Sequence, residues 1–177
     1  TVAKTAQELS QATRIILPGV GAFDWAMMRL NASGMRECLD ELVVGKQVPV
    51  LGICVGMQMM AKRSDEGKLP GLGWVDGEVK LLESDGPFKR RALPHMGWND
   101  VAPTEQVTLF KDIANPRYYF LHSYHFVLPD ATAKLAEADY HGRITCAVRK
   151  NNIYGVQFHP EKSHEWGVSL LRNFSKL

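Results

Sequence analysis

The sequence predicts an α/β protein in which helices flank a mostly parallel sheet and antiparallel strands follow in the C-terminal half. Two apolar runs, at 13–23 and 48–54, lack the alternation of half-exposed strands, which is typical of parallel strands covered on both faces. Near the C-terminus, three β-rich runs separated by turn residues indicate antiparallel pairing. The chain has 177 residues, which favours a single domain.

The first half alternates strands with helices. Residues 13–23 predict a short buried strand that ends in a loop rich in glycine and proline. Apolar groups then recur at helical spacing with a break near residues 31–34, where Ser33 could cap the second helical piece. Residues 48–54 predict the second strand, and from residue 56 to 63 the pattern changes to that of a helix.

The second half is richer in strands. The pair Asp76–Gly77 is typical of a hairpin turn, and the aromatic run 117–128 predicts one strand. Region 133–161 predicts three strands that turn at 141–142 and 151–152, where the residue types tolerate positive φ. A last helix is expected from residue 165, with an apolar stripe made of Val168, Leu171 and Phe174.

Charge and cysteine content exclude several classes of function. A net charge of +2 is too small to indicate binding to nucleic acid or to an anionic membrane, and the basic cluster at 88–91 is expected on a solvated loop. No apolar run approaches the ~20 residues that span a bilayer. The three cysteines have no paired spacing, and the N-terminal segment lacks the apolar core of a secretory signal. Both observations indicate reduced thiols and a cytoplasmic location.

The sequence GICVG at 52–56 is the first functional signal. A strand, a sharp turn that holds a nucleophile and a helix form a nucleophile elbow, and here Cys54 takes the place of the usual serine. Glycines are needed on both sides because the strand and helix backbones approach closely. The start of the helix would favour the reactive thiolate. The alternative is an unreactive buried cysteine on a strand interrupted by glycines.

The sequence FHPE at 158–161 supplies a candidate base. Pro160 donates no backbone hydrogen bond, so a strand is expected to end here, with His159 and Glu161 pointing the same way. The histidine could accept the thiol proton while the carboxylate orients its other ring nitrogen. The alternative is a capped strand end with an incidental ion pair.

The loop PGVG at 18–21 could stabilise an oxyanion. It follows a strand and precedes a helix, and its glycines permit unusual backbone angles. Each backbone N–H donor at a tetrahedral intermediate is worth about 10² to 10³ in rate, and the N–H of Val55 would be a second donor. Phosphate binding is disfavoured, because the loop has neither G-x-G-x-x-G nor a Lys-Ser/Thr pair.

These three motifs, in this order, resemble the class I (triad) glutamine amidotransferases, which share a flavodoxin-like fold. The segments PGVG, GICVGMQ at 52–58 and FHPE match the oxyanion loop, the elbow and the terminal His-Pro-Glu of the family. Within the family, LPHMGWN at 93–99 and YYFLHSY at 118–124 are most similar to the glutaminase subunits of imidazole glycerol phosphate synthases.

The resemblance implies a role for each matched residue. Cys54 would attack glutamine, His159 would act as base and acid, and Glu161 would orient it, so that a thioester forms and ammonia and glutamate are released. Neither a cofactor nor a metal is implied. The other matched residues are an oxyanion hole of Val20, Gly21 and Val55, substrate-binding residues Gly52, Gln58, Ser123 and Tyr124, and a partner-facing set of Gly97, Trp98, Asn99 and Tyr119.

The implied partner is a (β/α)8-barrel cyclase subunit that forms a heterodimer with the glutaminase. Ammonia would cross their interface, and the joint products would be imidazole glycerol phosphate and an aminoimidazole carboxamide ribonucleotide on the path to histidine. The glutaminase is expected to be slow alone and faster when the cyclase holds its ligand. Two alternatives stay open, namely a glutaminase subunit of another amidotransferase and an idle scaffold on the same fold.

The chain departs from the subfamily at two places. Val55 stands where leucine is usual, with little expected effect because the backbone N–H does the work. Subfamily members also open with a strand, a loop and a helix, about 25–35 residues in ordinary lengths, before the segment that matches Thr1. Residues 1–177 are therefore expected to be one amidotransferase domain without its first strand and helix, which would leave backbone groups of a neighbouring strand unpaired.

The remaining histidines and cysteines are expected to be structural. His122 and His125, three residues apart on one predicted strand, would face opposite ways, which argues against a zinc pair. Three clustered methionines, Met57, Met59 and Met60, are expected to pack on the sheet. Surface or loop positions are expected for His95, His141 and His164, and structural positions for Cys38 and Cys146.

Overall fold

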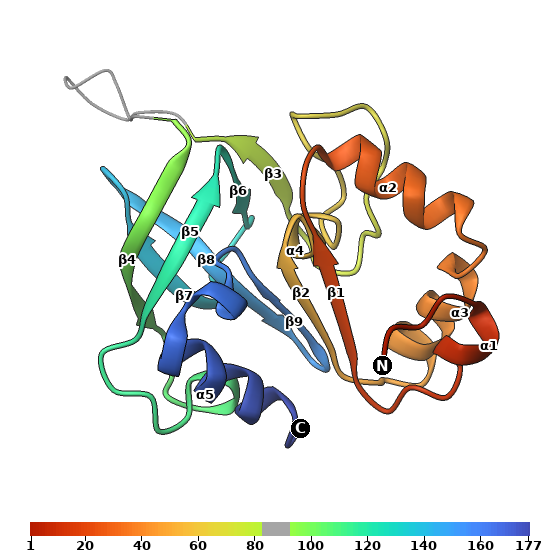
Figure 1. The fold of residues 1–177 in the computed structure, drawn as a ribbon. Coiled ribbons are helices and arrows are strands. Elements are labelled where there is room, and N and C mark those ends of the chain that lie inside the picture. The colour runs from red at the N-terminus through yellow and green to blue at the C-terminus, as the bar shows by residue number, and fades with distance from the viewer. Residues whose placement is uncertain (83–92) are drawn as a thin grey trace.

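The computed structural model describes residues 1–82 and 93–177, and its first part is a parallel sheet covered by helices. Strand β1 (Ile15–Gly19) pairs in parallel with β2 (Val50–Cys54), and β2 pairs in parallel with β9 (Ile153–Val156) on its other side. Figure 1 shows the first three helices beside β1. The helices of this part are α1 (Ala6–Leu9), α2 (Phe23–Ala32), α3 (Arg36–Asp40), a π-helix (Glu41–Gly45) and α4 (Val55–Gln58).

The second part is antiparallel and curls back on itself (Figure 1). From β9 the sheet continues in the order β8, β7, β4 and β5, while β6 pairs with β3 and also meets β8. A single bridge between Tyr119 and His159 brings β5 back beside the segment that follows β9. The strands are β3 (Glu78–Leu81), β4 (His95–Pro103), β5 (Arg117–His122), β6 (Tyr124–Val127), β7 (Lys134–Asp139) and β8 (Arg143–Lys150).

Three further helices complete the second part. Two of them are short 3-10 helices, at Thr108–Phe110 and Pro160–Lys162, and α5 (His164–Phe174) is the last element. The observed order of elements confirms an α/β protein with an antiparallel second half. The turns at 141–142 and 151–152 are also confirmed, with positive φ at His141, Gly142 and Asn151.

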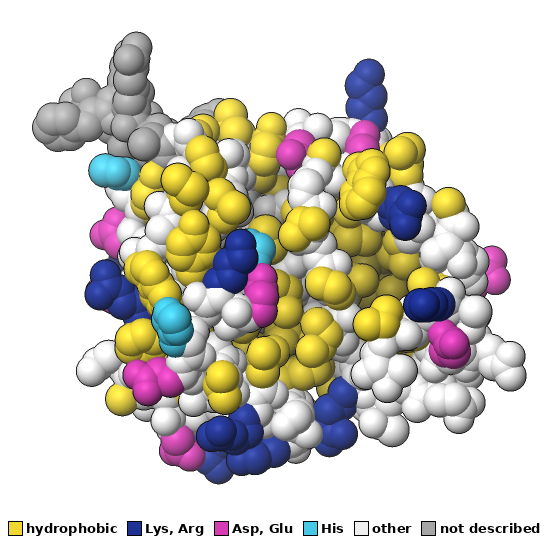
Figure 2. All heavy atoms as spheres, viewed as in Figure 1, with side chains coloured by type: hydrophobic (Ala, Val, Ile, Leu, Met, Phe, Trp, Pro, Cys, Tyr) yellow, Lys and Arg dark blue, Asp and Glu magenta, His cyan; other side chains and the backbone are white. Residues whose placement is uncertain are grey.

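Burial explains why the two halves have different sequence patterns. Every residue of β2 is buried, because strands lie on both sides of it and α4 packs on one of its faces. Its sequence is therefore continuously apolar. Strand β1 lies at the edge of the sheet, with Ile16 about half exposed. In the view of Figure 2, hydrophobic side chains gather between β1 and α2, where the surface is hollowed.

The helix expected at 56–63 is wrong in its length, since α4 ends at Gln58. The carbonyl groups of Met59, Met60 and Ala61 instead accept hydrogen bonds from the backbone of the distant segment 72–75. A partner remote in sequence therefore replaces the helical pattern. The expected burial of Met57, Met59 and Met60 is confirmed.

Three strand predictions also needed long-range information. No hairpin forms at Asp76–Gly77, because β3 pairs with β6 rather than with a neighbouring strand. The single strand expected at 117–128 is divided at Ser123, since β5 pairs with β4 whereas β6 pairs with β3. The last strand ends at Val156, three residues before His159. Strand β4 itself was not anticipated.

Two details of the helices differ from expectation. Ser33 closes α2 instead of starting α3, with its hydroxyl donating to the Leu30 carbonyl and accepting from the Met35 N–H. In α5 the residues that face the core are Gly167, Leu170 and Phe174, whereas Val168 is exposed. The basic cluster 88–91 lies outside the described residues. Within the described chain, no helix has the length and apolar character needed to cross a membrane.

Candidate active site

Three neighbouring parallel strands end at the same edge of the sheet, and each delivers one predicted motif there. In the register, Gly19 of β1 lies opposite Cys54 of β2, and Ile53 lies opposite Val156 of β9. The loop 18–21, Cys54 and the segment 157–161 therefore lie at three adjacent strand ends. The carboxyl ends of parallel strands are where open α/β sheets place their ligands.

Cys54 sits in a strained backbone conformation, with φ of 55° and ψ of −114°. Positive φ is uncommon for a side chain with a Cβ, and such strain is maintained only by the surrounding structure. The glycines provide that surrounding. A Cβ at Gly56 would fall on the carbonyl oxygen of Leu17, and one at Gly52 would lie 2.7 Å from the Gly56 oxygen. The close approach of strand and helix expected for an elbow is confirmed.

His159 is held on three sides. Its ring nitrogen Nδ1 lies 2.7 Å from Oε1 of Glu161. Its backbone N–H donates to the Tyr119 carbonyl at 2.9 Å, and its backbone carbonyl accepts the Ser163 hydroxyl at 2.6 Å. Ser163 also accepts the N–H of Tyr119 at 3.0 Å. Because the carboxylate accepts from Nδ1–H, Nε2 is the ring nitrogen available to a proton from substrate or thiol. His159 directly precedes the 3-10 helix Pro160–Lys162, rather than ending a strand.

Cys54 and His159 line one cavity of about 260 Å³. Of the sequence-predicted residues, this cavity brings together Val20, Gly21, Cys54, Val55, Gln58, Ser123, Tyr124 and His159. It is also lined by Glu66, Leu121, His122 and Lys162, which were not predicted. Gly52 lies within β2 beneath α4, and Glu161 lies behind His159. Neither of these two residues lines the cavity.

The helix start favours the thiolate of Cys54 through the N–H of Val55, as expected, but burial outweighs this effect. Burial raises the pKa of the Cys54 thiol to about 11, and the negative charges of Glu161 and Glu66 act in the same direction. The N–H of Val55 and the side-chain amide of Gln157 oppose the shift without cancelling it. The free chain therefore holds a protonated thiol at neutral pH.

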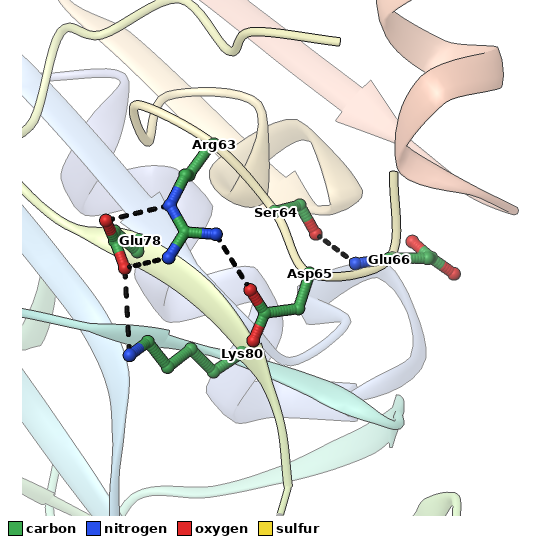
Figure 3. Close-up of polar contacts among 6 residues, drawn as sticks. All are labelled: Arg63, Ser64, Asp65, Glu66, Glu78 and Lys80. Atoms are coloured by element: carbon green, nitrogen blue, oxygen red, sulfur yellow. Dashed lines mark hydrogen bonds and ion pairs between the residues drawn. The ribbon is translucent and has the colours of Figure 1, made fainter. Parts of the chain in front are cut away.

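Sequence reasoning missed Glu66, which lies on a loop whose start is held by polar contacts (Figure 3). Its carboxylate accepts the N–H of Phe23 at 2.9 Å, and its own N–H donates to the Ser64 hydroxyl at 3.1 Å. Arg63 fixes the start of this loop to β3 through two hydrogen bonds to Glu78, at 2.9 and 2.8 Å. No local pattern places Glu66 at the cavity, because the contact of its carboxylate with Phe23 spans 43 residues of sequence.

The prediction that His95 is a surface or loop residue is also wrong. His95 is buried in β4, and its Nδ1 lies 2.9 Å from Nε2 of His122 in β5. Burial lowers the pKa of His122 to about 3, so this ring is neutral. Among the residues that the structure describes, no group of three or more His, Cys, Asp or Glu side chains could hold a metal ion.

The predicted partner-facing residues lie on β4 and β5, outside the cavity. Trp98 is opposite Tyr119 in the register, with their ring centroids 6.3 Å apart. Two positions further along the same strands, Met96 lies opposite Leu121, and both side chains are exposed. Figure 2 shows hydrophobic side chains gathered over these strands. Gly97 has a φ of 125°, and Asn99 points inward to hydrogen-bond His95 and the Asp139 carbonyl.

Comparison with known proteins identifies the family of this chain. The family model for glutamine amidotransferase class-I matches residues 1–177. The imidazole glycerol phosphate synthase subunit HisH of Bdellovibrio bacteriovorus is 58% identical over 177 residues, covering 99% of this chain and 87% of that protein. The subunit of the same name from Leptospira interrogans is 49% identical, with the same coverage of both chains.

Solved structures support the fold. A crystal structure of a glutamine amidotransferase covers 98% of this chain and 85% of its own, with a TM-score of 0.72 and 18% identity. A glutamine amidotransferase from Thermotoga maritima covers 95% of this chain and 64% of its own, with a TM-score of 0.61 and 18% identity. With the sequence relatives, these likenesses lead to one conclusion. The chain belongs to the class-I glutamine amidotransferase family and, within it, to the group of HisH subunits of imidazole glycerol phosphate synthases.

Proposed function

We propose that this chain is the glutaminase subunit of an imidazole glycerol phosphate synthase, with Cys54, His159 and Glu161 as its catalytic triad. The observation that carries the proposal is the shared cavity. A strained cysteine at a strand–helix junction and a histidine paired with a carboxylate face the same space. A nucleophile, a base and an orienting carboxylate are the parts that acyl transfer requires.

The reaction would proceed in two halves. Cys54 attacks the side-chain amide carbon of glutamine and gives its proton to His159, which forms a tetrahedral intermediate. The intermediate collapses as His159 protonates the departing nitrogen, so that ammonia leaves and a γ-glutamyl thioester stays on the sulfur. Water then attacks the thioester with His159 as base, which releases glutamate and restores the thiol.

The cavity offers groups for the rest of the substrate. The backbone N–H groups of Val20 or Gly21, together with that of Val55, are suited to bind the oxyanion. Glu66 is the carboxylate that lines the cavity, and we assign to it the α-ammonium group of glutamine. The amino-acid end would also contact Gln58, Ser123 and Tyr124, whereas Gly52 would act indirectly, by letting α4 approach β2.

The partner would dock on the face of β4 and β5. Exposed apolar side chains there, led by Met96 at 64% and Trp98 at 38% of full exposure, suit a protein interface. Because Leu121 belongs both to this face and to the cavity, ammonia would have a short path to the partner. We propose that the partner is a (β/α)8-barrel cyclase and that the complex works in the cytoplasm, in keeping with the free thiols of Cys38, Cys54 and Cys146.

The test is glutamate release from glutamine by the purified chain, alone and with the cyclase subunit of a bacterial imidazole glycerol phosphate synthase and its nucleotide ligand. We expect slow release alone, faster release with the liganded cyclase, and loss of both with Cys54→Ser. Cys38→Ser is the matched control, because this thiol lies away from the cavity. A folded chain that releases no glutamate in either condition would favour the idle scaffold. Release that ignores the cyclase would favour another amidotransferase.

A further inference from the structure

A pair of buried histidines, of which His122 lines the cavity and His95 does not, has no part in the reaction above. His95 and His122 lie directly opposite each other in β4 and β5, with His95 Nδ1 and His122 Nε2 2.9 Å apart. The ring of His95 is stacked between Phe120 and Tyr140, at centroid distances of 4.5 and 3.9 Å. Such tight packing fixes the ring plane, and with it the direction of each hydrogen bond.

The hydrogen-bond partners determine which ring nitrogen carries each proton. His122 Nδ1 lies 2.8 Å from the carbonyl of Tyr124, which can only accept, so this nitrogen is the donor. In the neutral ring His122 Nε2 must then accept, and His95 Nδ1 must donate to it. His95 Nε2 is left to accept from the side-chain amide of Asn99 at 3.2 Å. Every bond from Asn99 to Tyr124 therefore points in one direction.

The carbonyl of Tyr124 links this pair to the nucleophile. It accepts a second hydrogen bond from Gln58 Nε2 at 3.1 Å, and the same Nε2 also donates to Gln157 Oε1 at 3.1 Å. The amide of Gln157 in turn donates to the sulfur of Cys54 at 3.7 Å. In this path each amide nitrogen donates and each carbonyl oxygen accepts, as their chemistry requires.

We propose that these six hydrogen bonds, from Asn99 to Cys54, form one positioning chain for the nucleophile, in which His95 and His122 are positioning residues. His95 does not line the cavity, so it acts on the sulfur through the others. The chain begins beside Trp98, on the strand where we place the partner. The proposal rests on the proposed function for its meaning, but the first measurement below needs no glutamine hydrolysis.

The test compares His95→Phe with His95→Gln. Phenylalanine keeps the stacking on Phe120 and Tyr140 but removes both hydrogen bonds, whereas glutamine retains a donor and an acceptor. The rate of iodoacetamide alkylation at Cys54 is read at pH 8.5 by mass spectrometry of its peptide. We expect this rate to fall about threefold with His95→Phe, because a loosened Gln157 no longer stabilises the thiolate, and to recover in part with His95→Gln. Asn115→Gly, at an exposed position with positive φ, is the control and should match the unmodified chain.

The glutaminase reaction gives the second readout. In the complex with cyclase, kcat for His95→Phe should fall on the order of tenfold with KM changed less than about twofold, since the substrate contacts stay in place. The double variant with Gln157→Met should be no slower than Gln157→Met alone, because both changes break one chain. If the unmodified protein and all variants fail to hydrolyse glutamine, the result counts against the proposed function. The alkylation rates would still test the hydrogen-bond chain.

Two results would overturn the positioning chain. One is a folded His95→Phe protein, judged by far-ultraviolet circular dichroism, whose Cys54 reacts at the unmodified rate. The other is full additivity of the His95 and Gln157 effects, which would mean that the two residues act separately. If His95→Phe fails to fold, Asn99→Ala takes its place at the half-exposed end of the chain. The alkylation rate should fall in that variant too, and an unchanged rate contradicts the proposal.

Discussion

Cys54 and His159, the proposed nucleophile and base, are held in different ways. In the parallel half, Cys54 is fixed by its own backbone, wedged between glycines that let β1, β2 and α4 approach closely. His159, which follows β9 and meets β5 of the antiparallel part, is fixed by the side chains of Glu161 and Ser163 and by a backbone hydrogen bond to Tyr119. Damage to the first arrangement should affect the whole fold. Damage to the second should affect catalysis first.

Gly56→Ala should have the largest effect, because it tests the backbone arrangement directly. The new Cβ would fall on the Leu17 carbonyl, so that either β1 or α4 must move. We expect a loss of about 3 kcal/mol or more in the free energy of unfolding, measured by urea denaturation.

Gly45→Ala is the matched control for that loss. It makes the same chemical change where the nearest atom would lie at 3.9 Å, an ordinary contact. Its stability should stay equal or rise by about 0.5 kcal/mol, because alanine restricts the unfolded chain. Equal stability of both variants would show that the elbow does not depend on the glycine contact.

Glu161→Gln tests the side-chain arrangement and should have a smaller effect, confined to the reaction. Glu161 is about half exposed, so its loss should leave the fold intact. The amide no longer stabilises the imidazolium form of His159, and we expect kcat to fall by about 10- to 100-fold. Kinetics in the cyclase complex measure this change. Glu165→Gln, an exposed carboxylate nearby on α5, should keep full activity.

The same contrast explains how much the sequence could predict. The elbow in the parallel half could be predicted, because close backbone approach requires glycine at fixed spacing. The sequence shows this spacing around Cys54. Motifs of this kind predicted four residues that line the cavity, namely Val20, Gly21, Cys54 and Val55. His159 followed from the His-Pro-Glu motif, and Gln58, Ser123 and Tyr124 followed from the family resemblance. The length of α4 could not be predicted. The carbonyl groups that would have continued the helix accept hydrogen bonds from the backbone of residues 72–75 instead.

Several residues around the site could not be predicted from local patterns. Gln157 carries no local signal, because its partners Gln58 and Cys54 lie 99 and 103 residues away in sequence. Ser163 has a near partner in His159, but its contact with Tyr119 spans 44 residues. His95 looked like a loop residue since β4 was not recognised, and its burial depends on pairing with β5. Side-chain networks of this kind become visible only when the strand partners are known.

The charge of Glu161 connects the two arrangements, because it acts on Cys54 as well as on His159. With a pKa raised to about 11, the Cys54 thiol is almost fully protonated at neutral pH, and its thiolate fraction grows as pH rises. The rate of iodoacetamide alkylation at Cys54 should therefore increase about tenfold per pH unit between pH 7.5 and 10. A rate that levels off below pH 8 would contradict this. Because the charge of Glu161 helps to raise that pKa, Glu161→Gln should speed alkylation by a few-fold at pH 8.5 while it slows glutamine hydrolysis. Opposite changes in one variant would show that Glu161 acts on the sulfur of the parallel half as well as on His159.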